Sequence, residues 1–270
     1  MIRIFLLILA VSLPLVAHPQ QPKDRSITSD DFNNNRPKNL KRRPIPSRKT
    51  YRLASEPLAK PLDAHSPSTL KIGITLWKVR REGYGREARE VATRVEADTK
   101  FHEGDFVRLS IESPRTGYLY VIDRDWFSDG SAGGEMNLIF PHRGEDNRLE
   151  AGKLIDIPAQ DYAPFKASPK ANQAGEMLTI IVTSSPLSLP LSEDSLPVSS
   201  TQLVAWERKW SGMTERFEMN GGVGQTRTIE EQQAGIRQLT RDDPPPQTIY
   251  CLVPRSSDGL LFNLLLSYVR

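Results

Sequence analysis

Three aspartates, Asp123, Asp125 and Asp129, fall within seven consecutive positions and are the first candidates for chemistry in this sequence. Carboxylate oxygens gathered in a loop are the hard ligands that Ca²⁺ takes. The spacing departs from that of an EF-hand loop, which needs an oxygen donor at every second place and a terminal Glu. A polar turn in which Asp and Gly satisfy the backbone accounts for the same residues. We expect the turn, and keep a calcium site at these three residues as the alternative.

A hydrolase would need residues brought together from distant parts of the chain. Two histidines, His102 and His142, lie downstream of residue 70, and with Asp123 and Asp129 they are the residues to consider for such a site. The sequence has no nucleophile elbow, no P-loop and no zinc-protease motif. We therefore expect a protein that is not an enzyme and binds no cofactor, with an envelope hydrolase as the alternative.

The chain has one cysteine, Cys251, so no disulfide can form within it. A lone cysteine cannot supply a structural zinc site. Its neighbours Ile249, Tyr250, Leu252 and Val253 are typical of a strand, which favours a small buried hydrophobic side chain.

Residues 1–17 predict a cleavable signal peptide. Arg3 supplies a positive charge, an apolar run follows from Ile4 to Val16, and Ala17 precedes a polar stretch. A membrane span needs roughly 20 apolar residues, and this run is shorter. No later segment is long and apolar enough to span a membrane, so we expect an exported protein, periplasmic or secreted, with no transmembrane segment in its mature chain.

Residues 18–69 predict a disordered, basic, proline-rich linker. The stretch has no sustained apolar period and holds 11 Lys and Arg against 5 Asp and Glu, a net charge of +6. Such a composition buries too little apolar surface to offset the entropy of ordering. Residues 70–270 have a net charge of −4, so the basic character belongs to the linker. This segment could contact an anionic surface or serve as a solvated tether; we expect no nucleic-acid partner.

Residues 70–270 predict a single, mainly β domain. Alternating or fully apolar runs indicate strands separated by frequent Gly and Pro breaks, at 72–77, 91–95, 106–113, 118–122, 137–140, 153–157, 176–184, 248–253 and 261–269. The turn residues 114–117 predict a hairpin between the third and fourth of these runs. The pattern favours an antiparallel β-sandwich-like domain with one or two accessory helices.

The accessory helices are expected at about 200–240. Leu203, Trp206, Trp210, Met213 and Phe217 recur at helical spacing, which predicts one amphipathic helix lying on the core. A capping box at 228–231 predicts the start of a second helix, continued by apolar residues at 229, 236 and 239.

The order of turns and strands between Trp77 and Leu187 resembles a known bacterial family. The residues that carry the resemblance are Phe101-His-Glu-Gly-Asp105, Val107-Arg-Leu-Ser-Ile111, Gly117-Tyr-Leu-Tyr-Val-Ile122, Asp129-Gly130, Leu138-Ile-Phe-Pro141, Ala151-Gly152, Ile157-Pro158, Gly175-Glu176 and Ser184-Ser-Pro-Leu187. This run is similar to the domain of unknown function 4384 family. The resemblance implies an all-β domain, often an accessory module joined to enzymatic or signalling partners. The family has no established activity, so it assigns no catalytic residue.

These observations predict an exported, non-catalytic binding or interaction module of the bacterial cell envelope, whose partner is an envelope protein or glycan. Sandwich domains bind ligands through their loops or edge strands.

Overall fold

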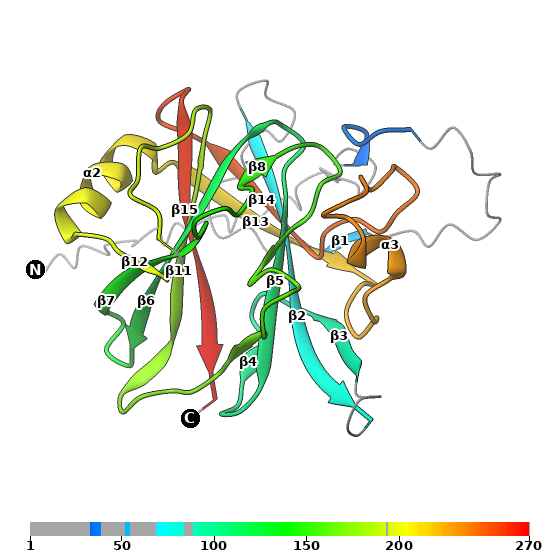
Figure 1. The fold of residues 1–270 in the computed structure, drawn as a ribbon, viewed down its shortest axis with the longest axis horizontal. Helices are drawn as coiled ribbons and strands as arrows, with labels where there is room; N and C mark the ends of the chain where they lie inside the picture. Colours follow the sequence, from blue (N-terminus) through cyan, green and yellow to red (C-terminus); the bar gives the residue numbers. More distant parts are fainter. Residues whose placement is uncertain (1–32, 39–51, 55–68, 84–88, 193, 270) are drawn as a thin grey trace, which may run out of the picture.

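The computed structural model describes residues 33–38, 52–54, 69–83, 89–192 and 194–269. The predicted signal peptide, and most of the predicted linker, lie outside these residues. Two β-sheets built mainly of antiparallel pairs pack face to face, with one helix beside each sheet (Figure 1). The prediction of a mainly β, sandwich-like fold is confirmed. In the described part of the chain, no helix is long and apolar enough to cross a membrane.

The first sheet, sheet A, follows the order β1-β13-β14-β2-β5-β10, with β3 paired to β2 and β9 to β5. All its pairs are antiparallel. Its strands are β1 (Arg52–Ala54), β2 (Leu70–Glu82), β3 (Arg89–Val95), β5 (Phe106–Glu112), β9 (Ile155–Ile157), β10 (Phe165–Lys166), β13 (Met213–Asn220) and β14 (Thr248–Val253).

The second sheet, sheet B, follows the order β12-β7-β6-β11-β15-β4, with β8 paired to β6. The short β4 runs parallel to β15, and the other pairs are antiparallel. Its strands are β4 (Lys100–Phe101), β6 (Gly117–Phe127), β7 (Ala132–Phe140), β8 (Arg148–Leu149), β11 (Gln173–Thr183), β12 (Leu196–Pro197) and β15 (Gly259–Tyr268).

The main core lies between the sheets and follows from the period-two alternation of the strands. The inner faces of β6, β11 and β15 contribute Leu119 and Val121, Leu178 and Ile180, and Leu260 to Leu266 at every second position. From sheet A, Ile72, Ile74, Leu109 and Ile111 meet them.

A second apolar layer covers the outer face of sheet B. Helix α2 (Ser200–Trp210) packs Leu203 and Trp210 against Ile122, Ile181 and other outer-face residues of β6, β11 and β15. The central strands of sheet B are therefore buried on both faces, as the apolar residues at successive positions of 176–184 predict.

Residues 222–247 lie against the outer face of sheet A, which combines polar side chains with the buried Trp77, Ile249 and Cys251. Trp77 of β2 lies against the guanidinium groups of Arg94 and Arg227, at 5.2 and 5.4 Å from its ring centre. Arg94 pairs with Glu231, and Arg227 pairs with Asp156 at 2.8 Å. These buried charges are matched by partners, as a folded interior requires.

The predicted hairpin between 106–113 and 118–122 is wrong. β5 belongs to sheet A and β6 to sheet B, so residues 113–116 carry the chain across the sandwich. The turn signal was correct, but a local turn does not determine which sheet the next strand joins. Gly117 is needed at the arrival point, because a Cβ there would lie 2.9 Å from Val182 and 3.1 Å from the Thr183 carbonyl.

The helix predicted through Met213 and Phe217 ends instead at Trp210. A Cβ at Gly212 would lie 2.1 Å from the carbonyl oxygen of Val253, so the backbone there runs directly against β14 and leads into β13. In β13, Phe217 pairs with Ile249. Tertiary strand pairing therefore overrides the helical spacing.

The second predicted helix is shorter than expected. The capping box at Thr228 and Glu231 is present, but α3 spans only Ile229–Gln232. Leu239 is buried, whereas Ile236 is 99% exposed, so the spacing of apolar residues beyond α3 does not mark a helix face.

Two pieces of the predicted linker are part of the folded unit. Arg36 is 3% exposed, and its guanidinium forms two parallel hydrogen bonds to the Glu112 carboxylate, at 2.6 Å from Nε and 2.5 Å from Nη2. Its Nη1 donates to the carbonyls of Asp243 and Pro244 at 3.0 and 3.1 Å. Further along the chain, β1 pairs with the edge of β13. The folded unit therefore extends beyond the predicted start at Leu70.

Replacing Arg36 by Ala should destabilise the protein by about 3–5 kcal/mol, because Glu112 is then a buried charge without its partner. Thermal or denaturant unfolding measures the loss. Lys38→Ala, an exposed position two residues away, is the matched control and should change stability by about 0.5 kcal/mol or less.

The second variant is Glu112→Gln in the Arg36→Ala background, which should recover part of the loss because a neutral amide is cheaper to bury. If Arg36→Ala behaves like Lys38→Ala, the docked segment contributes nothing to the fold.

Candidate functional site

Polar side chains interrupt the apolar inner face of sheet B at one end of the sandwich. Asp123 and Asp125 follow Val121 at inner-face positions of β6, and Glu176 lies opposite Asp125 on β11. Tyr268 occupies the equivalent end of β15. Because directly paired residues of antiparallel strands project from the same side, these four side chains share one region between the sheets.

An acidic cavity of about 120 Å³ opens at this end, and Asp123, Glu176 and Tyr268 supply polar groups to its wall. The apolar part of the wall comes from both sheets: Phe101, Val107, Ile139, Phe165, Leu178 and Leu266. Apolar walls with a few convergent polar groups are the usual form of a small-ligand site.

A hydrogen-bond network fixes the carboxylates around the cavity. Glu176 Oε1 accepts from the Tyr268 hydroxyl at 3.0 Å and from Gln173 Nε2 at 2.8 Å. The same amide nitrogen donates to Asp125 Oδ1 at 2.9 Å, and Lys170 Nζ pairs with Asp125 Oδ2 at 2.9 Å. Asp125 is thus neutralised by a lysine, whereas Glu176 is held by neutral donors.

The carboxyl groups of Asp123 and Glu176 interact at the cavity. Asp123 Oδ1 is shielded from solvent, and no donor among the described residues reaches it. Two ionised carboxylates are both acceptors, so a hydrogen bond between them would require a proton on one of them.

Burial and neighbouring charges raise the pKa values of three polar groups at the cavity. Burial raises the pKa of Asp123 to about 6, and the negative charge of Asp125 adds to the rise. Burial, followed by the charge of Asp123, raises the pKa of Glu176 to about 7. Burial and the neighbouring Glu176 raise the pKa of Tyr268 above its usual range, which keeps its hydroxyl a donor. Paired carboxyls that titrate near neutrality in a cavity are typical of functional sites.

Asp129 is not part of this cluster. It lies in the turn between β6 and β7, where its Oδ1 accepts from the Ser131 hydroxyl at 2.6 Å and the Ser131 amide at 2.9 Å. These bonds lower the pKa of Asp129. The polar turn therefore exists at Asp129, while Asp123 and Asp125 belong to a strand. Among the described residues, no group of three acidic, His or Cys side chains is arranged to hold a metal ion.

The histidines of the hydrolase alternative lie apart from each other. His102 is exposed beside Phe101, which pairs with Tyr268 near the acidic cavity. His142 follows Phe140, which pairs with Val121 further back along β6, and its Nδ1 lies 3.3 Å from Glu145.

Of the site residues that the sequence patterns did not predict, Glu176 has one signal in the sequence. Glu176 stands at the start of the inner-face series that continues with Leu178, Ile180 and Val182, so a carboxyl there breaks an apolar face. Tyr268 is distant in sequence and joins the site through the pairing of β15 with β11. No local sequence pattern predicts this pairing.

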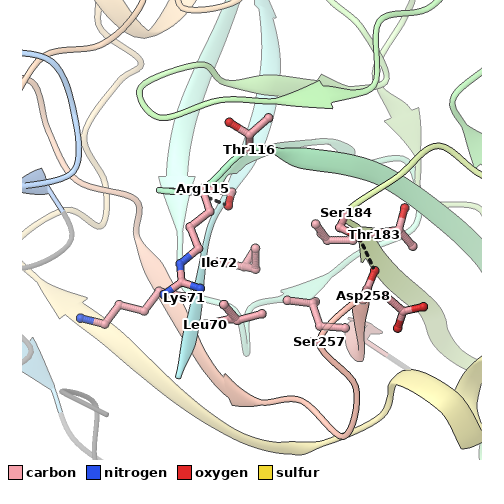
Figure 2. Close-up of a pocket in the computed structure, with 13 residues that line it drawn as sticks. Leu70, Lys71, Ile72, Arg115, Thr116, Thr183, Ser184, Ser257 and Asp258 are labelled. Carbon is pink, nitrogen blue, oxygen red and sulfur yellow. Dashed lines mark hydrogen bonds between the residues drawn. The ribbon is translucent and has the colours of Figure 1, made fainter. Parts of the chain in front are cut away.

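A second hollow, of about 170 Å³, lies at the opposite end of the sandwich, between the start of β2 and the end of β11 (Figure 2). Two of its hydroxyls are engaged: Thr183 donates to the carbonyl of Ser185 at 2.7 Å, and Ser184 donates to the carbonyl of Asp258 at 3.3 Å. In Figure 2 the Lys71 side chain points away from the other residues of the hollow. The acidic cavity is the stronger candidate because it holds titratable groups between its walls.

Cys251 is buried in β14, as its apolar neighbours predict. Burial raises the pKa of its thiol to about 12, so the thiol stays protonated at neutral pH.

The segment that carries Asp123, Asp125 and Glu176 is the one that comparison with known families recognises. Residues 100–186 match the family described as Domain of unknown function (DUF4384). The predicted resemblance to this family is confirmed over that segment, which runs from β4 to β11 and leaves Tyr268 outside. No curated protein and no solved structure matches the chain.

The acidic pair should make stability depend on pH. The raised pKa values mean that the folded state holds more protons than the unfolded chain above about pH 4, so the pair's contribution is complete below that pH. It is lost as the pH rises through about 6 and about 7. Asp123→Asn with Glu176→Gln removes this titration.

Between about pH 4.5 and 8, wild type should therefore lose stability relative to the double variant, on the order of 2 kcal/mol after allowance for solvent screening. Denaturant unfolding across the pH series measures it, with Asp129→Asn as control. Parallel curves for wild type and the double variant would show that the carboxyls titrate as in the unfolded chain.

Proposed function

We propose that this chain is an exported binding or interaction module of the bacterial cell envelope, periplasmic or secreted, and that it holds its ligand at the acidic cavity. The observation that carries the proposal is the meeting of Asp123 and Glu176, from separate strands, in a cavity with apolar walls. The partner we propose is an envelope protein or a glycan that offers a group complementary to the carboxyl pair.

The arrangement of the chain supports a displayed module. The signal at residues 1–17 would direct export, and the basic residues of 18–69 would contact an anionic surface or act as a tether. Arg36 docks against Glu112 at the far end of β5 from Val107, which lines the cavity. Five residues of strand separate the two, a distance of about 17 Å. A partner at the cavity and a surface contact upstream of Arg36 would therefore use different ends of sheet A.

Capture from envelope extract tests this proposal. Full mature chain should enrich one or more envelope proteins or glycans, and Asp123→Asn with Glu176→Gln should reduce that enrichment at least about tenfold, because the isosteric groups keep the shape but remove the charge. Asp129→Asn is the matched control, since Asp129 lies on the exposed turn outside the cavity.

Residues 18–69 alone serve as a second control for capture by basic charge. Equal enrichment by wild type and the double variant would remove the cavity from the proposal. Fractionation of cells that express the full chain tests export, and retention in the cytosol would contradict it.

An envelope hydrolase is the second candidate, and the same pair favours it. Two adjacent carboxyls whose pKa values lie near neutrality can act as general acid and general base. The residues would then be Asp123 and Glu176, in place of a set that includes His102 and His142. Turnover of ester, peptide or glycoside substrates, lost in the Asp123→Asn and Glu176→Gln variants, would favour this candidate over pure binding.

A further inference from the structure

We propose that the acidic cavity binds a primary alkylammonium group, that Asp123 and Glu176 share one proton while the cavity is empty, and that binding displaces this proton. This inference rests on the proposed function, since it names the chemistry of the ligand at the same site. The ammonium group would take the place of the proton between the carboxyls, and its carbon stem would lie against the apolar wall.

The volume and apolar walls of the cavity favour a short carbon chain on the ammonium group. A protein cavity of about 150 Å³ takes up benzene, so one of about 120 Å³ has room for a shorter group of about five heavy atoms. Phe101 of β4, Val107 of β5 and Ile139 of β7 face it with apolar side chains. A bare metal ion would leave these walls unused, whereas an alkylammonium fills both parts of the site.

The charges around the pair leave one net negative charge for the ligand. Asp125 of β6 is paired with Lys170, and Tyr268 of β15 donates to Glu176 as a neutral phenol. Lys166 of β10 also lines the cavity, but the lysine whose charge acts on Asp123 and Glu176 is Lys170, which is already paired with Asp125. With one proton shared, the Asp123–Glu176 pair carries a single negative charge in a partly dry site, where a fixed charge acts strongly.

Exchange of the shared proton for the ammonium group conserves charge and needs no other reactant. The ammonium enters with its three N–H groups and donates to oxygens of the two carboxyls, and the shared proton leaves to solvent. Both carboxylates are then ionised beside one bound cation, so the net charge of the filled site equals that of the empty one. Three donors suit the lone pairs of two carboxylates.

Affinity should therefore depend on pH. With pKa values of about 6 and about 7, the pair is fully protonated at low pH and offers no charge to an ammonium. Binding should strengthen as the pH rises through this range and level off above it, once no proton remains to be displaced.

The test is calorimetric titration of the full mature chain with n-butylammonium at about pH 5.5, 6.5 and 8.5, in buffers of different ionisation heat. We expect affinity to rise at least about tenfold from the lowest to the highest pH, with close to one proton released at pH 6.5 and almost none at 8.5. Asp123→Asn with Glu176→Gln should lose binding and proton release, while Asp129→Asn should retain both.

Three further ligands define the chemistry. Tetramethylammonium, which has no N–H group, should bind at least about tenfold more weakly than n-butylammonium. Nα-acetyl-lysine methylamide and glucosamine distinguish a protein lysine from an amino sugar as the source of the group. Affinity that does not vary with pH, no proton release, or equal binding of tetramethylammonium would overturn the inference.

Failure of this inference and failure of the proposed function give different results. If envelope capture depends on Asp123 and Glu176 but no amine binds, the ligand class is wrong and the binding site stands. If capture is also unchanged in the double variant, both are wrong.

Discussion

Burial of the central strands of sheet B on both faces is the constraint from which the rest of the structure follows. Between the sheets, the inner faces of β6, β11 and β15 exclude water over most of their length, and α2 closes the outer face. A polar side chain on such a face must find a partner or give up its charge. Asp123 and Glu176 lie where this apolar layer ends, and burial raises the pKa of both carboxyls, which favours their uncharged forms.

The same constraint explains which strands the sequence predicts correctly and which it does not. Runs such as 176–184 are apolar at successive positions, and this predicts a central strand covered on two sides, as β11 is. Period and turn signals also predict most other strands. They fail where tertiary contact decides: Phe217 has helical spacing but pairs in β13, and Gly117 follows a turn but enters the other sheet.

The sequence predicts only part of the candidate site. The run of aspartates is apparent in the sequence, but Asp123 and Asp125 lie on the inner face of β6, whereas Asp129 lies in the turn that follows the strand. Glu176 interrupts the alternating apolar pattern of β11, and this interruption marks it as a candidate site residue. Tyr268 joins the site through the β11–β15 register, and Arg36 docks through a contact with Glu112 across 76 positions. Pairings of this kind depend on the assembled fold and leave no local pattern.

Titration of the side-chain carboxyl carbons of Asp123 and Glu176 by NMR tests most directly the proposed sharing of one proton between about pH 6 and 7. The account predicts two coupled steps, with apparent pKa values near 6 and 7, and loss of the coupling when either residue is replaced by its amide. Independent titration of both carboxyls near pH 4, the ordinary range for exposed Asp and Glu, would contradict it.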